Sequence, residues 1–215
     1  MIRQFLLVAV ALMMLTAPAD AAAQSEGCRD CKANGPETAQ LIKQADRLYG
    51  EFKPREAAAE LQKVLQVEPG NLEALAKLSR AHIDIGDSIP ESSPDWRERR
   101  IREYRQAESY ARQAIKTHPN STWGYFYVAA SLGTMAGLLP VAKQVEIAEE
   151  IRAAAEKAIA LDPQNGFAYH ALGVWHRRMA EIVRRVGSWL RYGMAALCPR
   201  GIWTNPLSFL RKRFH

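Results

Sequence analysis

The side chains best suited to redox or metal chemistry are three cysteines and five histidines. Cys28 and Cys31 form a C-x-x-C pair near the N-terminus, whereas Cys198 stands alone. A thioredoxin-type pair would follow a strand and open a helix, and a zinc site would need four ligands. The sequence around the pair offers neither context. We therefore expect a local disulfide between Cys28 and Cys31 in an oxidising compartment, or a pair that plays no part in function.

The histidines do not form a recognisable catalytic set. No Asp or Glu lies three or four residues from both members of a histidine pair. The sequence also has no arrangement of nucleophile, base and orienting residue, and no phosphate-binding loop. We therefore predict no catalytic residue, no metal site, no cofactor and no small-molecule substrate. An enzyme stays open as an alternative, because a catalytic triad need not be local in sequence.

Residues 1–23 have the pattern of a signal peptide. Arg3 supplies a positive start, Phe5 to Leu15 is an unbroken apolar run, and A-x-A sequences at 19–21 or 21–23 offer a cleavage site. A bilayer-spanning helix needs about 20 apolar residues, and this run is well short of that. We expect a periplasmic or secreted protein in which residues 24–36 form a flexible leader. An uncleaved N-terminal anchor is the alternative.

Beyond the leader, one plan recurs in which an amphipathic helix runs into a proline turn and a second helix follows. The turns lie at Pro69, Pro119 and Pro163. The composition is rich in alanine and low in β-branched residues, which favours helices over strands. Small residues such as Ala45 and Ala57 stand where paired helices would cross closely.

This pattern resembles the tetratricopeptide repeat (TPR) superfamily, whose unit is about 34 residues. The resemblance implies an all-α, right-handed α-solenoid of antiparallel helix pairs over residues 37–197, with about three and a half repeats. The closing prolines are 50 and 44 residues apart, so we expect elongated second helices in repeats two and three. In repeat two we expect Ser93 to cap the second helix and Pro94 to lie in its first turn.

The long second helices suggest a narrower resemblance, to the regulator of microtubule dynamics family and its bacterial relatives. The segments that carry it are 74–81 (ALAKLSRA), 125–127 (YFY) and 171–176 (ALGVWH), within a span from Ala39 to His176. His82 and His176 occupy a repeat position where an aromatic residue is usual, and we expect each to pack as that residue would. Gly173 is likewise expected to be a packing residue.

The superfamily resemblance implies a binding groove lined by the first helices. The matching positions are Tyr49, Lys77, Arg80, Trp123, Tyr127, Phe167 and His170. Aromatic residues with a little positive charge favour an extended peptide or an apolar partner helix, with Arg80 or Lys77 able to bind a carboxylate. In the alternative, Tyr127 and Phe167 only seal neighbouring repeats. The fuller set of Lys and Asn used by chaperone-binding relatives is missing.

The C-terminal part from Arg177 onward is strongly basic, with nine Lys or Arg against one acidic residue. Apolar residues recur at helical spacing up to Leu197, which predicts the second helix of a fourth repeat with its arginines in solvent. The alternative is a basic amphipathic segment on an anionic lipid surface. We expect residues 198–215 to be a poorly ordered basic tail, divergent or out of frame. A nucleic-acid partner is not expected for a secreted protein.

Together these features predict a non-enzymatic interaction module of the cell envelope that binds a protein or peptide in its concave groove. A structural protein attached to the membrane surface through its basic C-terminal segment is the alternative.

Overall fold

A computed structural model of the chain describes the backbone of residues 35–195 and the side chains up to residue 187. This part contains seven helices and no strand: α1 (Pro36–Gly50), α2 (Pro54–Val67), α3 (Leu72–Asp87), α4 (Trp96–Thr117), α5 (Thr122–Ala136), α6 (Val141–Leu161) and α7 (Gly166–Ala195). The expected signal peptide, the Cys28–Cys31 pair and the tail at 198–215 lie outside the described residues.

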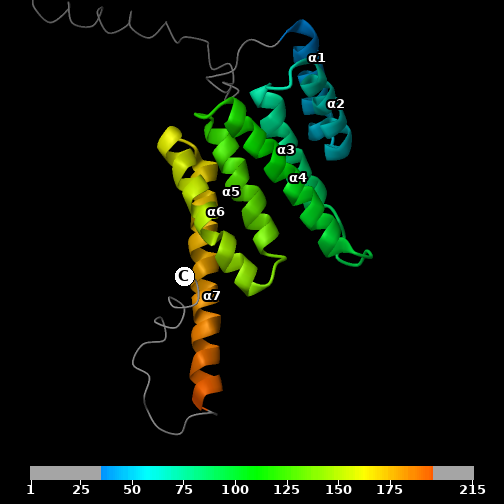
Figure 1. Cartoon of the computed structure of the whole chain (residues 1–215). Coiled ribbons are helices and arrows are strands. Elements are labelled where there is room, and N and C mark those ends of the chain that lie inside the picture. Colours follow the sequence, from blue (N-terminus) through cyan, green and yellow to red (C-terminus); the bar gives the residue numbers. More distant parts are fainter. Residues whose placement is uncertain (1–34, 196–215) are drawn as a thin grey trace, which may run out of the picture. The chain divides into compact units, whose positions relative to one another are not determined.

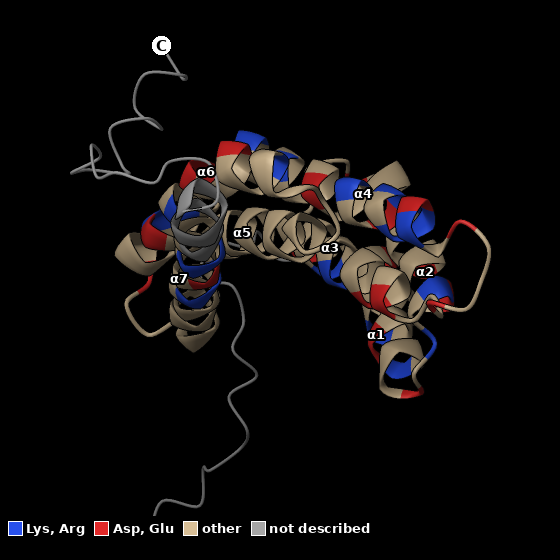
Figure 2. Ribbon diagram, turned by 90° about the horizontal axis from the view of Figure 1, so that it is seen from below, with Lys and Arg blue, Asp and Glu red and all other residues tan. Residues whose placement is uncertain are grey.

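The helices pack as successive pairs, as predicted for a TPR-like α-solenoid (Figure 1). α1 packs on α2, α3 on α4 and α5 on α6, and each pair packs on the next. In addition, α3 contacts α5, and α5 contacts α7. The first helices therefore form one row, and Figure 2 shows α4 and α6 in the other.

The three turns between pairs share one hydrogen-bond pattern. The backbone N–H groups of Asn71, Ser121 and Asn165 each donate to the carbonyl three residues earlier, at 3.0, 3.0 and 3.1 Å. Their side-chain oxygens accept from the backbone N–H three residues later, at 2.9, 3.1 and 3.2 Å. Each cap satisfies an N–H that the first helical turn would leave unpaired. The prolines predict these turns; the caps that fix the start of each following helix are an additional finding.

The first turn is also tied to the start of α1 through Glu68. Its carboxylate accepts hydrogen bonds from Asn71 at 2.8 Å, from Thr38 at 2.9 Å and from the Gly35 backbone N–H at 3.4 Å. These bonds, with that from Asn71 the strongest influence, lower the pKa of Glu68. Because Thr38 is buried in α1, the network fixes the first helix against the α2–α3 turn.

Small residues let the helices approach closely, as expected at Ala45 and Ala57, which are both buried. Two glycines do so as well. A Cβ atom on Gly86 would lie 2.5 Å from Cε1 of Tyr104, and one on Gly124 would lie 2.9 Å from Cγ1 of Ile115. Tyr104 is buried and donates a 2.6 Å hydrogen bond to Asp87, so its ring cannot easily move away from Gly86.

The second helices of repeats two and three are elongated, as predicted. α4 has 22 residues and α6 has 21, against 14 in α2. The start of α4 differs from the expectation. Ser93 donates to the Pro90 carbonyl at 2.7 Å in the preceding turn, and Asp95 adopts a left-handed φ of 51° before the helix begins at Trp96. Ser93 is therefore not the cap, and Pro94 lies outside the helix.

The fourth repeat departs from the prediction. α7 runs unbroken for 30 residues, so the segment after His176 continues the first helix and does not fold back as a second one. The sequence explains this, because no proline or turn signal interrupts residues 177–186. Gly173 consequently has no packing role, since a Cβ atom there would meet nothing within 4 Å.

Candidate functional site

α5 is the centre of the first-helix row, and it carries no charged residue (Figure 2). It contacts α3, α4, α6 and α7. A helix that is apolar on most sides is one that its neighbours bury. At its N-terminal end, however, α5 carries three aromatic side chains that stay partly exposed: Trp123, Phe126 and Tyr127. This end of α5 is where the candidate site lies.

These three rings meet Phe167 from the first turn of α7, and we call the four residues the aromatic patch. The ring centroid of Trp123 lies 5.9 Å from that of Phe167 and 6.1 Å from that of Tyr127. Phe126 lies 5.8 Å from Phe167 and 4.8 Å from Tyr127. All these spacings fall in the range of favourable aromatic pairs. The patch joins two repeats, and it brings together three of the residues that the sequence predicts for the groove.

The members of the patch differ in exposure, which separates packing from binding. Phe167 is 59% exposed, although it is a large apolar side chain. Tyr127 is mostly covered, and burial raises the pKa of its hydroxyl to about 12. Tyr127 therefore has little surface left for a ligand. Phe167 presents a free ring face, so sealing alone does not account for it.

The two predicted cations of α3 have partners within the chain. Lys77 pairs with Asp46 on α1 at 2.5 Å and with Glu73 at 2.9 Å. The guanidinium carbon of Arg80 lies 4.3 Å from the ring centroid of Tyr49, in a cation–π contact. The predicted groove residues Tyr49, Lys77 and Arg80 thus form a link between α1 and α3. Both cations therefore already interact within the chain, and neither is held free to bind a ligand carboxylate.

His170 is exposed on α7, one turn after the start of that helix, and it has no ring contact with the aromatic patch. Two residues of the site were not predicted. Phe126 stands in the YFY segment that carried the family resemblance, where its neighbour Tyr127 was chosen instead. Asp84 lies one helical turn after Arg80 on α3, and its charge influences Tyr127. The sequence offers no signal for it, because what distinguishes it, the lack of a partner among the described residues, is visible only in three dimensions.

The two histidines at equivalent repeat positions behave differently. His82 stacks on Tyr110 with centroids 5.5 Å apart, and its Nδ1 lies 2.8 Å from Glu103, so it packs as the expected aromatic residue would. His176 is exposed, and its ring meets that of Trp175 edge-on, with centroids 4.8 Å apart. The reason is that no described helix covers α7 on that side. Within the described part of the chain, no three His, Cys, Asp or Glu side chains are grouped closely enough to hold a metal ion.

The sequence of this chain matches a known protein family. The sequence model of the family described as "Regulator of microtubule dynamics protein 1-3" matches residues 41–196. The chain belongs to the regulator of microtubule dynamics family. Regulator of microtubule dynamics protein 1 of Bos taurus is 26% identical over 151 residues, which are 68% of this chain and 44% of the bovine protein. The chain thus matches less than half the length of this relative.

Solved TPR domains share the fold with this regulator of microtubule dynamics family member. The Sgt2 TPR domain from Aspergillus fumigatus has a TM-score of 0.56 at 17% identity, covering 74% of this chain and 88% of that one. The first TPR domain of the human RPAP3 protein has a TM-score of 0.52 at 16% identity, covering 69% and 96%. The first TPR of Spaghetti (RPAP3), which is bound to the HSP90 peptide SRMEEVD, has a TM-score of 0.50 at 17% identity, covering 67% and 94%. At these identities the likeness establishes the fold alone.

Proposed function

We propose that this family member is a non-enzymatic scaffold of the cell envelope that binds an extended peptide or a partner helix along its first helices. The observation that carries the proposal is the aromatic patch, where the exposed face of Phe167 joins Trp123 and Phe126 across two repeats. Exposed aromatic surface on a rigid row of helices suits the capture of apolar side chains from a peptide. The peptide-bound TPR of Spaghetti supports the general mode of binding.

A pull-down from an envelope extract tests this proposal. Trp123→Ala should lose the captured partners, because it removes the ring that contacts three other members of the patch. Tyr169→Ala is the matched control, since Tyr169 is also an exposed aromatic residue of α7, at 49%, but it has no ring contact with the patch. If Trp123→Ala and Arg80→Ala both retain every partner, the first helices are not the binding surface.

The cell-envelope location rests on the signal-peptide pattern of residues 1–23. Mass spectrometry of the protein from the envelope fraction should find an N-terminus at position 22 or 24, as the two A-x-A sequences predict. Recovery of the chain with an intact Met1 would contradict cleavage and would favour the N-terminal anchor.

The second candidate, attachment to a membrane surface, is favoured by one observation on α7. The helix continues past His176, where Ile182 is still buried, and it exposes Arg177, Arg184 and Arg185. No described helix has the length and apolar character to cross a bilayer. Flotation with anionic liposomes, with and without residues 177–215, tests this candidate. Absence of lipid binding by both forms would remove it.

A further inference from the structure

The last first helix, α7, lacks the second helix that covers each of its predecessors. α3 packs on α4, and α5 packs on α6. α7 contacts α5 and α6, but no helix follows it among the described residues. The side of α7 on which a second helix would pack can therefore be compared with the covered sides of α3 and α5.

The helix caps put the three helices in register. Asn71, Ser121 and Asn165 directly precede α3, α5 and α7, and each accepts the same hydrogen bond. Counting from the caps, four positions at the spacing of one helix face correspond in all three helices. We call the four α7 residues the open face: Gly173, His176, Ala180 and Val183. Their equivalents are Ser79, His82, Gly86 and Ile89 in repeat two, and Ala129, Leu132, Ala136 and Leu139 in repeat three.

These positions are covered in both earlier repeats and exposed in α7. All eight equivalents are buried or partly buried, and Ile89 and Leu132 are each only 3% exposed. In α7 all four residues are exposed, and Val183 reaches 59%. A Cβ atom on Gly173 would meet nothing within 4 Å. Ile182 is buried on another side of α7, so the exposure is a property of this face and not of the whole helix.

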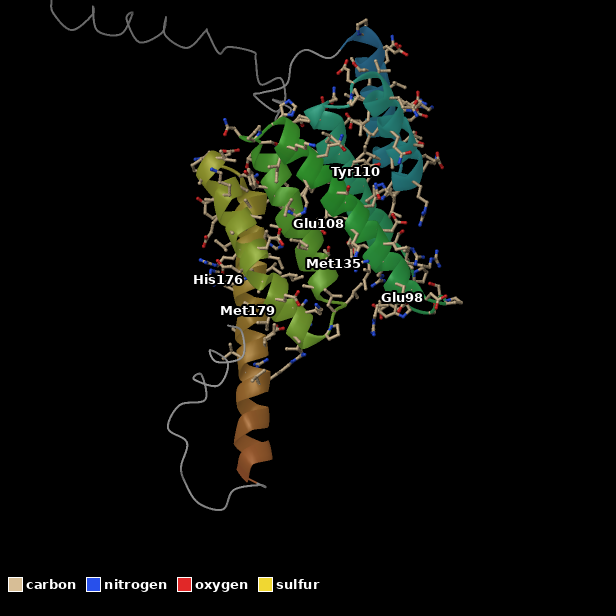
Figure 3. All side chains as sticks on the ribbon, in the orientation of Figure 1. Glu98, Glu108, Tyr110, Met135, His176 and Met179 are labelled. Atoms are coloured by element: carbon tan, nitrogen blue, oxygen red, sulfur yellow. The ribbon has the colours of Figure 1, made fainter. Side chains whose placement is uncertain are left out.

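The contacts of His82 show what its equivalent on the open face lacks. His82 stacks on Tyr110 of α4 with centroids 5.5 Å apart, and its Nδ1 lies 2.8 Å from the Glu103 carboxylate of the same helix. His176 holds the same repeat position at the end of the row of helices (Figure 3), and it is exposed. A helix that packed there as α4 packs on α3 would bring a carboxylate to His176.

The small residue of the open face allows a helix to approach closely. Gly86 lies against the ring of Tyr104 on α4. Ala136 is 5% exposed and belongs to the same core cluster as Ile151 of α6. Ala180 is the equivalent residue of α7, so an aliphatic side chain from another helix could pack on it in the same way.

One edge of the open face is basic. Arg177 and Arg184 are exposed and lie seven residues apart, which is two helical turns, so they share this edge. Arg178 pairs with Glu181 at 4.0 Å, whereas among the described residues no ion pair engages Arg177 or Arg184. An acidic partner would therefore complement this edge.

The same charge argues against two other ways of covering the face. A second copy packed on it symmetrically would bring these arginines against their own equivalents. Residues 196–215 of this chain carry four basic residues and no acidic one. Like charges that face each other are unfavourable, so neither the second copy nor this segment suits the edge.

We infer that the open face of α7 binds an acidic amphipathic helix of a partner protein, which takes the place of the second helix of repeat four. The partner helix presents a Glu side chain to His176 and small or aliphatic side chains to Ala180 and Val183. Further Asp or Glu residues follow the edge of Arg177 and Arg184. The inference goes beyond the proposed function, because the open face and the aromatic patch are different surfaces.

Fluorescence anisotropy with two designed helices tests this inference on the purified full chain. Both peptides have the 22 residues of α4, with a hydrocarbon staple on the outer side to keep them helical. Both keep Glu103, Ala107, Tyr110 and Ala111, and both carry Leu for Tyr104 to leave room for the Cβ atom of Ala180. The remaining positions are Glu and Ala in the acidic helix, and Lys and Ala in the basic helix. At low salt we expect the acidic helix to bind about tenfold more tightly or better, and this preference should shrink at high salt.

Two variants assign the binding to the open face. Ala180→Trp should weaken the acidic helix by about tenfold or more, because a large side chain prevents the close approach. Ala153→Trp is the matched control, since Ala153 is an exposed alanine of α6. The double variant Arg177→Glu/Arg184→Glu should reverse the preference in favour of the basic helix. Arg102→Glu/Arg105→Glu is its control, because both arginines are exposed on α4 and the net charge changes equally.

Several results would overturn the inference while leaving the aromatic patch untouched. These are equal binding of the two helices, no binding of either, and full binding by Ala180→Trp. Binding that appears only after removal of residues 196–215 would show that this segment covers the face. A dimer in analytical ultracentrifugation that Ala180→Trp converts to a monomer would show that a second copy does so. If neither helix binds but anionic vesicles do, and the Arg177→Glu/Arg184→Glu variant loses them, the edge serves a lipid surface instead.

Discussion

At the scale of single residues, the ionised side chain of Asp84 lowers the stability of the folded protein at neutral pH. Asp84 has a folded-state pKa of about 6, above the ordinary value for a carboxyl. A raised carboxyl pKa means that the folded state binds its proton more readily than the unfolded state does. Stability from this group therefore increases as pH falls from about 7 to about 4.

The first prediction is that Asp84→Asn stabilises the protein at neutral pH. After allowance for solvent screening, the gain should be about 1 kcal/mol, or roughly 2–4 °C in Tm for a chain of this size. The difference should be mostly lost by pH 4, where Asp84 is protonated in the folded state and partly protonated in the unfolded state. Thermal unfolding of both proteins from pH 4 to 8 measures it. A constant difference at all pH values would show that the Asp84 charge is not the cause. Besides burial, the charge of Asp87 on the same helix is what raises the pKa of Asp84.

Residue roles were harder to predict than residue positions. The repeat spacing located Trp123, Tyr127 and Phe167, which the structure brings into one patch. It could not show that Lys77 and Arg80 are engaged within the chain, since their partners Asp46 and Tyr49 come from another helix. Nor could it identify Asp84, because the feature that distinguishes it is a missing partner in three dimensions.

At the scale of helices, two helices can approach closely where one of them carries a glycine at the contact. Gly86 brings α3 against the ring of Tyr104 on α4, whereas Gly133 of α5 has nothing within 4 Å of its Cβ direction. The two glycines look alike in the sequence, and each lies within a helix. Only the first is required by its surroundings.

The second prediction contrasts these two glycines. Gly86→Ala should destabilise the protein by about 1–3 kcal/mol, because the added methyl group overlaps a buried ring. Gly133→Ala should leave stability unchanged or increase it by up to about 1 kcal/mol, through the helix preference of alanine. Urea unfolding measures both. Equal effects of the two substitutions would show that α3 and α4 adjust freely around Tyr104.

The third prediction concerns the caps. Ser121→Ala should cost about 1 kcal/mol, because the Gly124 N–H loses its acceptor at the start of α5. Ser121→Asp should retain most of the stability, since its carboxylate can accept the same bond. Asn120→Ala is the control, because Asn120 is exposed in the same turn. Urea unfolding of the three variants tests this, and a loss in Asn120→Ala as large as in Ser121→Ala would argue against capping as the source.

Helices were largely predictable because the apolar periodicity and the prolines are local signals. Their ends were less so. The start of α4 depends on the left-handed conformation of Asp95, which the Ser93-Pro94 pattern does not reveal. The fate of residues 177–195 depended on whether α7 turns back, and amphipathic spacing is the same in either case.

At the scale of the whole described unit, α7 ends the row of helices, and one side chain does much to hold it there. Trp175 donates from Nε1 to the Ala148 carbonyl of α6 at 2.6 Å and packs with Ala171 and Leu172 on the core shared by α5 and α6. Because Phe167 lies on the same helix, the docking of α7 also completes the aromatic patch.

The fourth prediction follows from that docking. Trp175→Phe should cost about 1 kcal/mol for the lost hydrogen bond, and Trp175→Ala should cost roughly 3 kcal/mol. In Trp175→Ala, limited proteolysis should cleave α7 before the rest of the unit, and binding to the patch should weaken although no patch residue has changed. Tyr169→Ala is the control on the same helix. Unchanged protease resistance of α7 in Trp175→Ala would show that other contacts hold it.

The absence of charged residues from α5 has a consequence for folding during synthesis. The chain is synthesised from its N-terminus, so α5 emerges before α6 and α7, the helices that cover it on one side. Until α6 and α7 have been synthesised, the apolar surface of α5 stays exposed to solvent, and α5 has no charged residue to keep it soluble. Folding intermediates with exposed apolar surface aggregate readily. Premature termination after residue 140 should therefore yield insoluble protein, whereas the α1–α4 portion, rich in charges, should not. The helix that supplies three rings of the aromatic patch is therefore also the segment most prone to cause aggregation during synthesis.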